Sequence, residues 1–472
     1  MIRLLHAYVP KRTLLLGISE ACLITLALVA SALARLGPER ASYMLTYQYG
    51  SLKILFVSVA FLTCMYYFDL YDSTIVSNGR EAVVRLIQVL GVAYLALGLL
   101  YYLYPPVQLG RGIFNIGFLL VGLLLLLWRR LFSVINSTAG LAEQVVILGD
   151  GALAESLVHE IETRPELGIR VAGRAQMSAI GEQRVNRNRA EMPITLSQTS
   201  FCEELAVSPQ IRGIDRIVVA MEERRGKLPV NLLLTLKNRG VRVQDGNDVY
   251  ESITGKVPIE SIRLSWLLFS PGSHTSRLFL LYKRFASIVI SIMGLLLGLP
   301  LFPFVILAIK ISSPGRVFYW QNRVGLDGQV FRCYKFRTMR TDAESDTGPT
   351  WAEHDDPRVT RVGRFLRKTR MDEIPQLVNV LKGDMSLVGP RPERPEFVAE
   401  LTEKIPYYHL RQSVRPGITG WAQILYRYGS SVEDAKEKLR YDLYYIKNSS
   451  AGLDLLIFLN TIKIVLVGRG AK

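Results

Sequence analysis

Two adjacent acids in the last third of the chain have the residue types and the setting for phosphate chemistry. Asp372 and Glu373 stand just before Pro375, which suits the first turn of a helix, and Gly383 can end that helix. A helix N-terminus favours both carboxylates and incoming phosphate oxygens. Adjacent helical positions project about 100° apart, so one acid can attack phosphorus while the other binds a metal or handles a proton. An isolated Asp-Glu pair is more often a plain helix cap.

Basic residues flank the two acids on both sides. Ahead of them an arginine recurs at every third position: Arg358, Arg361, Arg364 and Arg367. Behind them Arg391 stands between two prolines, whose preset backbone lets the guanidinium meet a phosphate at low entropy cost. These four arginines form a basic stripe along one side of a helix. On composition alone such a stripe is a solvated face or a lipid contact, but its place beside the acids favours phosphate binding by some of its arginines. Further on, Trp421 follows a rigid turn and could pack against a base or a sugar.

An apolar run at residues 286–309 lies ahead of these motifs and has basic residues at both ends. Pro300 and Pro303 fall inside the run, and each removes a helix hydrogen bond and clashes one turn back. A straight span would place the basic C-terminal third outside the cell, whereas the basic residues at both ends of the run suggest that both ends return to the cytoplasm. We therefore expect a broken, re-entrant helix at 284–310. The alternative is a fifth full span with a proline kink.

The chain opens with further apolar segments, each able to cross a hydrocarbon core of about 30 Å. They lie at residues 13–34, 51–68, 83–104 and 113–128. With the N-terminus inside, seven flanking Lys and Arg lie on the cytoplasmic side against four outside, which favours this orientation. Glu20 lies within the first run, where a carboxylate either serves a function or faces neighbouring helices. Mean hydropathy of +0.22 and a net charge of +16 fit a membrane protein with anionic partners.

Between the apolar regions the sequence changes to a soluble α/β pattern. A short strand at Gln144–Leu148 leads into the turn Gly149–Ala154 and a helix that ends near Thr163, as in a dinucleotide-binding fold. A strand at Arg216–Ala220, a helix at Pro229–Lys237 and a strand at Val241–Val243 complete a Rossmann-like outline. The stretch 168–174 offers no acid to hold a ribose. This favours a degenerate fold used for packing, assembly or regulation over nucleotide binding.

In their order and register, the motifs between residues 282 and 463 resemble the catalytic domain of bacterial polyprenyl-phosphate phosphoglycosyl transferases. This monotopic family initiates exopolysaccharide, O-antigen and glycoprotein glycan synthesis. The apolar runs and the Rossmann-like segment resemble its large, exopolysaccharide-initiating members. The resemblance implies a mixed membrane protein with a four-helix transmembrane block at 1–135, a Rossmann-like α/β domain at 143–265, and a small α/β catalytic domain at 278–472 that begins with the re-entrant helix.

The resemblance also implies a role for each candidate residue. Asp372 would displace UMP and carry the sugar phosphate as an acyl phosphate, while Glu373 would assist metal binding or the attack of the lipid phosphate. Both acids would hold Mg²⁺. The residues implied in phosphate binding are Arg367 and Arg391, with Lys335 and Arg337 as weaker candidates. Pro300 would break the re-entrant helix, although the family usually has Ser-Pro where this chain has Leu299-Pro300.

The same resemblance implies the substrates and the location. The donor would be a UDP-sugar, with glucose or galactose phosphate as the first expectation and N-acetylhexosamine phosphates as the second. The acceptor would be undecaprenyl phosphate in the bacterial inner membrane, with the catalytic domain on the cytoplasmic side. Both substrates are anionic, so a basic pocket with Mg²⁺ offsets their repulsion. Membrane lipid is an expected partner, nucleic acid is not, and a homodimer is also considered.

Two other functions remain open from the residues. An NAD-dependent nucleotide-sugar dehydratase or epimerase would need a Tyr-x-x-x-Lys pair, and that spacing occurs only at Tyr49 and Lys53, beside a membrane span. A non-enzymatic membrane scaffold that binds acidic lipid would explain the basic charge, but not the rigid proline-arginine loops beside the acids. The chain's four cysteines show no metal-ligand spacing, which predicts reduced structural thiols.

Overall fold

A computed structural model shows the chain as two compact units, which are described separately. Residues 9–249 form most of the first unit and residues 250–472 most of the second. The residues that the structure describes are 2–4, 7–9, 11–71, 79–137, 142–164, 167–175, 214–221, 223–224, 228–261, 276–341, 343, 356–426, 429 and 431–467. The expectation of a reduced thiol at Cys202 lies outside them.

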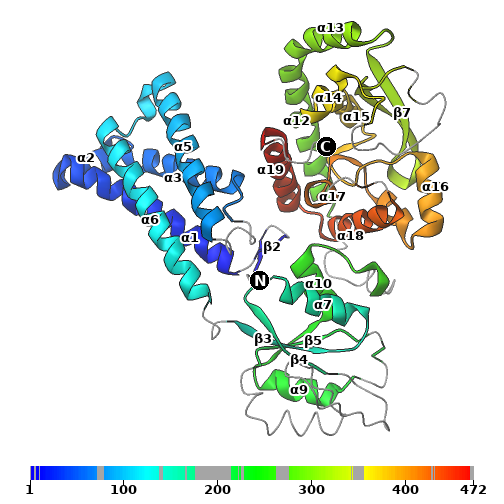
Figure 1. The fold of residues 1–472 in the computed structure, drawn as a ribbon, viewed down its shortest axis with the longest axis horizontal. Helices are drawn as coiled ribbons and strands as arrows, with labels where there is room; N and C mark the ends of the chain where they lie inside the picture. The colour runs from blue at the N-terminus through cyan, green and yellow to red at the C-terminus, as the bar shows by residue number, and fades with distance from the viewer. Residues whose placement is uncertain are drawn as a thin grey trace. The chain divides into compact units, whose positions relative to one another are not determined.

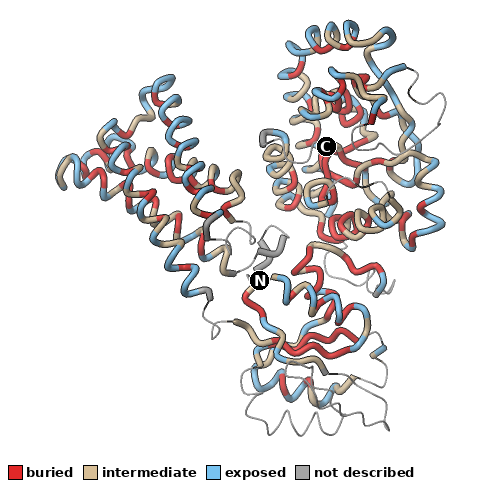
Figure 2. The backbone as a smooth tube through the Cα atoms, in the orientation of Figure 1, coloured by how far each residue is buried: buried red, intermediate tan, exposed pale blue. Residues whose placement is uncertain are grey.

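Long apolar helices make up the N-terminal part of the first unit (Figure 1). They are α1 (Lys11–Leu36), α2 (Pro38–Tyr47), α3 (Gly50–Tyr67), α5 (Gly79–Leu103) and α6 (Arg111–Ser137). All but the short α2 coincide with the expected apolar runs and are long and apolar enough to cross a membrane. Buried and exposed positions alternate along each helix (Figure 2), with Ile24, Phe61 and Val121 in a shared core. Exposed leucines such as Leu95 and Leu119 suit contact with lipid.

Glu20 faces its neighbours inside this helical region. Its side chain is 0% exposed, and Arg129 Nε of α6 donates to its carboxylate at 2.7 Å. The same guanidinium donates to the carbonyl oxygen of Leu70 at 3.1 Å. A buried charge needs a partner of this kind. These contacts favour the structural alternative for Glu20, which ties α1 to α6.

The second part of the first unit is a four-stranded parallel sheet of order β4-β3-β5-β6. Its elements are β3 (Glu143–Leu148), α7 (Ala152–Glu162), β4 (Ile169–Ala175), β5 (Arg216–Val219), α9 (Val230–Asn238) and β6 (Arg242–Asp245). α10 (Gly246–Thr254) follows β6, and its residues from Tyr250 on belong to the second unit. Gly149 opens the turn between β3 and α7 with a φ of 142°, and a Cβ there would lie 2.4 Å from the carbonyl oxygen of Ala220. Only glycine fits at that position. At the end of β4, Arg174 donates to the Gly149 carbonyl oxygen at 3.0 Å.

The second unit begins with an apolar helix that breaks at Pro300. α12 (Arg277–Gly298) passes through a 3₁₀ turn, η6 (Leu299–Leu301), into α13 (Phe302–Ser312). α13 leaves the end of α12 in a different direction (Figure 1), as expected where prolines interrupt the hydrogen-bond ladder. The outer side chains of both helices are apolar and exposed, including Leu297 and Phe304.

The rest of the second unit is a small α/β domain. Its elements are β7 (Phe318–Val324), β8 (Val330–Phe336), α14 (Arg361–Lys368), η8 (Met371–Glu373), α15 (Gln376–Lys382), β9 (Ser386–Val388), α16 (Pro395–Lys404), η9 (Tyr408–Ser413), β10 (Gly417–Thr419), α17 (Trp421–Leu425), α18 (Val432–Asn448) and α19 (Ala451–Val467). β7 and β8 pair antiparallel, while β9 and β10 pair parallel. The core of this domain contains Leu387, Tyr444 and Ile457, among other residues.

The segment from Tyr250 to Ser261 belongs to the second unit, although it was expected within the Rossmann-like domain. Glu251 accepts from the buried Lys447 Nζ at 2.9 Å, and the Gly255 carbonyl oxygen accepts from Trp421 Nε1 at 2.9 Å. Trp421 is therefore a core residue that stacks on Tyr444, with ring centroids 5.7 Å apart. The expectation that it packs against a base or sugar is wrong, because its ring is covered and its N–H group is satisfied within the core.

Candidate active site

A sharp chain reversal places the two acids of the motif. α14 begins at Thr360, whose hydroxyl oxygen accepts from the Gly363 N–H group at 2.9 Å. After the helix ends, Arg370 adopts a left-handed conformation with a φ of 57°, which few residues other than glycine adopt. The chain then enters η8, which carries Asp372 and Glu373, and continues into α15. The acids thus lie at the start of a helix, as expected.

Glu373 lies at the centre of a cluster of positive charges. Its carboxylate is paired with Arg391 at 2.7 Å, Lys335 at 3.3 Å and Arg370 at 3.4 Å. Burial alone would raise the pKa of Glu373, but Arg391, Lys335 and Arg370 together hold that pKa well below its ordinary value. Glu373 is therefore ionised at neutral pH, and its three cationic partners fix its orientation.

Asp372 has a different environment, although it is the adjacent residue. Its side chain is also buried, with 6% exposed, yet no hydrogen bond or ion pair to its carboxylate occurs in the described part of the chain. Burial raises its pKa, and the charge of Glu373 adds to the rise, while Lys335, Arg367 and Arg391 oppose it. The carboxylate of Asp372 is thus free to bond to another atom. The two acids have separate environments, which supports separate roles.

The structure brings most of the predicted phosphate-binding residues to these acids. Lys335 reaches them from β8, Arg391 from the loop after β9, and Arg367 from the last turn of α14. Arg367 is held in place by the Thr338 hydroxyl, which accepts from its Nε at 3.0 Å. Arg367 is the member of the arginine stripe whose charge acts on Asp372. Of the others, Arg358 pairs with Asp356 at 2.6 Å, and two lie exposed on α14.

The hydrogen bonds of Arg337, a weaker candidate, go to the end of a helix and not to the acids. Its terminal nitrogens donate to the carbonyl oxygens of Pro314 and Ser313 at 2.8 and 2.7 Å. Those carbonyls follow the C-terminal end of α13, so the guanidinium ties this helix end to β8. The geometry favours a structural role for Arg337.

Several contacts fix α15, the helix that follows the acids. Asn379, fully buried, donates to the Arg332 carbonyl oxygen at 2.7 Å and accepts from the Tyr334 N–H group at 3.1 Å, which joins α15 to β8. Arg284 of α12 donates to the carbonyl oxygens of Val380 and Leu381 at the end of α15. The broken apolar helix and the acid-bearing turn are thereby held together.

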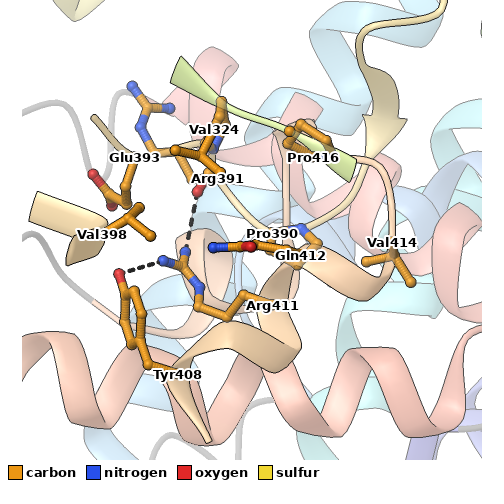
Figure 3. Close-up of a pocket in the computed structure, with 12 residues that line it drawn as sticks. Val324, Pro390, Arg391, Glu393, Val398, Tyr408, Arg411, Gln412, Val414 and Pro416 are labelled. Carbon is orange, nitrogen blue, oxygen red and sulfur yellow. Dashed lines mark hydrogen bonds between the residues drawn. The ribbon is translucent and has the colours of Figure 1, made fainter. Parts of the chain in front are cut away.

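The loop that carries Arg391 is clamped by another arginine, Arg411 (Figure 3). Arg411 donates to the Arg391 carbonyl oxygen at 3.0 Å, to the Tyr408 hydroxyl at 2.6 Å and to the Asp442 carboxylate at 2.8 Å. Burial raises the pKa of Tyr408 to about 12, so its hydroxyl stays neutral. From β7, Arg323 donates to the Pro392 carbonyl oxygen at 3.1 Å. The backbone around Arg391 is therefore fixed from two sides.

The sequence reasoning missed Arg370, Arg411 and Asp442. Arg370 stands directly before the motif, but its contact with Glu373 depends on a backbone reversal that the sequence does not signal. Asp442 lies in a tyrosine-rich helix between buried residues such as Tyr441 and Leu443. An acid on the buried face of such a helix is a signal that could have pointed to a buried cation.

The carboxylates can be tested for fit to Mg²⁺. Among the described residues, no group of three or more His, Cys, Asp or Glu side chains could hold a metal ion. Mg²⁺ commonly binds through one or two carboxylates and takes its remaining ligands from substrate phosphates and water. Asp372 has a free carboxylate, and Glu373 Oε2 has only the 3.4 Å contact with Arg370. The pair thus fits a Mg²⁺ ion that arrives with a phosphorylated substrate.

Long apolar helices and a cation-rich carboxylate site in an α/β domain define a membrane protein with a catalytic domain. The family model for bacterial sugar transferases matches residues 278–468, and the model for a CoA-binding domain matches residues 66–244. The first covers the helix break and the whole acid site. The second covers apolar helices and the parallel sheet.

Curated relatives extend the likeness over most of the chain. A UDP-glucose:undecaprenyl-phosphate glucose-1-phosphate transferase of Xanthomonas campestris pv. campestris is 30% identical over 84% of this chain and 83% of its own length. The enzyme of the same name from Escherichia coli K12 is 33% identical over 68% of this chain and 67% of its own length. An Aeromonas hydrophila UDP-N-acetylgalactosamine-undecaprenyl-phosphate N-acetylgalactosaminephosphotransferase is 44% identical, over 48% of this chain and about half (52%) of its own length.

The chain therefore belongs to the bacterial sugar transferase family, and it is a phosphoglycosyl transferase. This confirms the family that the motifs between residues 282 and 463 resemble. It also confirms the expectation that the protein is an enzyme, and it disfavours the alternative of a non-enzymatic membrane scaffold.

Proposed function

We propose that this enzyme transfers a sugar-1-phosphate from a UDP-sugar to undecaprenyl phosphate and releases UMP, as the first membrane step of exopolysaccharide synthesis. The observation that carries the proposal is the contrast within the acid pair: Asp372 has a free carboxylate, while Glu373 is held by three cations. The relatives' names supply the substrate classes, and they include both glucose and N-acetylgalactosamine phosphates. Glucose and galactose phosphate remain the first expectation for the sugar.

The reaction proceeds in two displacements at one phosphorus atom. A carboxylate oxygen of Asp372 bonds to the phosphorus that carries the sugar, the bond from that phosphorus to the bridging oxygen breaks, and UMP leaves with the electron pair. An oxygen of the lipid phosphate then bonds to the same phosphorus. The bond to Asp372 breaks and restores the free carboxylate, and the lipid now carries the sugar through a diphosphate.

The positive side chains around the acids stabilise the charge that develops on phosphorus. Lys335 and Arg391 act on both acids, and Arg367 acts on Asp372. All three can interact with phosphate oxygens as these approach. Mg²⁺ would be held by Asp372 and Glu373 together with diphosphate oxygens, and would neutralise part of the charge on the phosphates. Because Glu373 keeps a low pKa, it is a poor proton acceptor, and we assign it to orienting the site.

The apolar helices give the enzyme its place in the membrane. Between the basic Arg284 and the break, the stretch 285–298 has 14 residues, a length of about 21 Å, which is short of the ~30 Å hydrocarbon core. Arg284 is bonded to α15, so this end of the helix stays with the catalytic domain. We therefore propose that α12 and α13 form a re-entrant helix broken at Pro300, and that α1, α3, α5 and α6 span the inner membrane with the catalytic domain on the cytoplasmic side.

The experiment is UMP release from a panel of UDP-sugars with undecaprenyl phosphate and Mg²⁺, for the wild type and for Asp372→Asn. Release with one donor, lost in the variant, supports both the reaction and the nucleophile. Release that persists in the variant overturns the role of Asp372. Absence of release with every donor from folded wild-type protein overturns the proposed reaction.

A further inference from the structure

A largely apolar pocket of about 190 Å³ adjoins Glu373. It lies among η8, α15, β10, α17 and α19. Most of its wall is aliphatic, from Ile374, Leu377, Ile418, Ile424, Ile464 and Val465. Its charged lining residues are Glu373 and Arg370, which pair with each other. The charged end of this pocket thus lies beside the acids of the active site.

The polar groups of this pocket offer little to a nucleotide. The hydroxyls of Thr419 and Thr461 bond to each other at 2.6 Å, and Gln423 Nε2 donates to the Ile418 carbonyl oxygen at 3.2 Å. Gln423 Oε1 is buried without a hydrogen-bond partner, but it is an acceptor and does not attract a phosphate oxygen. None of the described residues that line the pocket is aromatic, so they offer a base no stacking surface. An apolar chain with an anionic end fits these walls better than a nucleotide does.

The pocket adjoins the broken apolar helix. Two residues that line the pocket, Leu377 and Ile374, pack closely against glycines of α12. A Cβ at Gly294 would lie 2.9 Å from Leu377, and a Cβ at Gly298 would lie 3.4 Å from Ile374. α19, which forms another part of the wall, also contacts α12. On another side of α19, Leu455 and Leu459 are exposed. The helices around the pocket thus present apolar surface suited to lipid, the phase in which a polyprenyl tail is dissolved.

We propose that this pocket holds the first isoprene units of the polyprenyl phosphate acceptor. The aliphatic walls take the chain, and its phosphate lies at the end formed by Arg370 and Glu373. From there the phosphate oxygens can approach the phosphorus carried by Asp372, the residue next to Glu373. This inference rests on the proposed function, and it adds a location for the acceptor that is separate from the cations expected to bind the donor.

Val465→Trp in the full-length enzyme tests the proposal, because an indole there fills the pocket from the last turns of α19. Leu459→Trp is the matched control, since Leu459 is equally exposed (38% for each) on the same helix but does not line the pocket. The measurements are KM for undecaprenyl phosphate and for farnesyl phosphate, KM for the UDP-sugar, and UMP release without acceptor.

We expect Val465→Trp to raise the KM of both acceptors on the order of tenfold. The donor KM and acceptor-free UMP release should stay within about twofold of the wild type, and Leu459→Trp should resemble the wild type throughout. An acceptor KM that matches the control, or a rise confined to the donor KM, overturns the proposal. If the wild type itself transfers nothing, the proposed function fails, and that outcome is distinct from an active wild type with an insensitive pocket.

A second measurement does not depend on any variant. A farnesyl phosphate analogue with a diazirine on its first isoprene unit should label α19 or α15 in the wild-type protein. Undecaprenyl phosphate should compete with this labelling, and phosphatidylglycerol should not. Labelling outside these helices, or equal competition by phosphatidylglycerol, overturns the proposal.

Discussion

Replacing Arg411 with lysine tests how the Arg391 loop is held in position. The guanidinium of Arg411 bonds at once to the Asp442 carboxylate, the Tyr408 hydroxyl and the Arg391 carbonyl oxygen, at 2.8, 2.6 and 3.0 Å. A lysine keeps the positive charge beside Asp442, but a compact ammonium cannot reproduce the planar fork that reaches all three acceptors. We expect the bond to the Arg391 loop to be lost while the fold is kept.

The size of the effect follows from that bond. A hydrogen bond from a charged group contributes about 1.5–3 kcal/mol. Arg391 pairs with Glu373 at 2.7 Å, so a displaced loop also loosens the cation cluster around the acids. If the full cost falls on the transition state, kcat drops about 10- to 150-fold, since about 1.4 kcal/mol corresponds to a factor of ten.

The assay is steady-state transfer to undecaprenyl phosphate, with thermal unfolding measured on the same samples. Arg415→Lys is the control, because exposed Arg415 also donates to a backbone carbonyl oxygen, that of Gly383, at 3.1 Å. We expect a lower kcat for Arg411→Lys, a nearly unchanged melting temperature, and near wild-type behaviour of the control. A kcat equal to that of the wild type would refute the claim that Arg411 positions the Arg391 loop. A loss of activity in proportion to the fraction of unfolded protein would mean that Arg411 only stabilises the fold.

Three further predictions concern the nucleophile, the domain boundary and the membrane helix. Lys335→Gln should move the acid limb of the pH profile of acceptor-free UMP release to higher pH. The substitution removes a cation that lowers the pKa of Asp372, and Asp372 must be ionised to react. An unmoved acid limb would show that another group titrates. A catalytic fragment that starts at residue 278 should melt on the order of 10 °C below one that starts at residue 246. The shorter fragment lacks Glu251, the partner of buried Lys447, and removing one partner of a buried ion pair costs about 3–5 kcal/mol. Equal melting temperatures would contradict this. A cysteine at Pro303 should resist a membrane-impermeant thiol reagent applied from the periplasm, and labelling there would indicate a full span.

The sequence was informative where local chemistry determines the structure. Prolines in an apolar run predicted the break at Pro300, because a missing N–H group and a ring clash act within one turn. The proline and glycine that bound α15 placed the acids at its start. The apolar runs also predicted the long helices within a few residues, since burial in lipid leaves little choice of backbone structure.

The sequence was uninformative where partners come together only through the tertiary fold. Arg411 and Asp442 are 31 positions apart and meet through the packing of η9 against α18. Arg337 remains a predicted phosphate ligand, but the sequence did not show that its guanidinium bonds to carbonyl oxygens at a helix end, because the planar fork that binds phosphate also binds carbonyl oxygens. Trp421 was misassigned because a tryptophan that packs in a core and one that stacks on a sugar have the same sequence signature.

The most direct test of the central claim is intact-protein mass spectrometry of the enzyme mixed with its UDP-sugar and Mg²⁺ in the absence of acceptor. The account predicts a covalent sugar-phosphate adduct that maps to Asp372, disappears when undecaprenyl phosphate is added, and is absent from Asp372→Asn. UMP release at the full rate without any adduct, or an adduct on another residue, would contradict it.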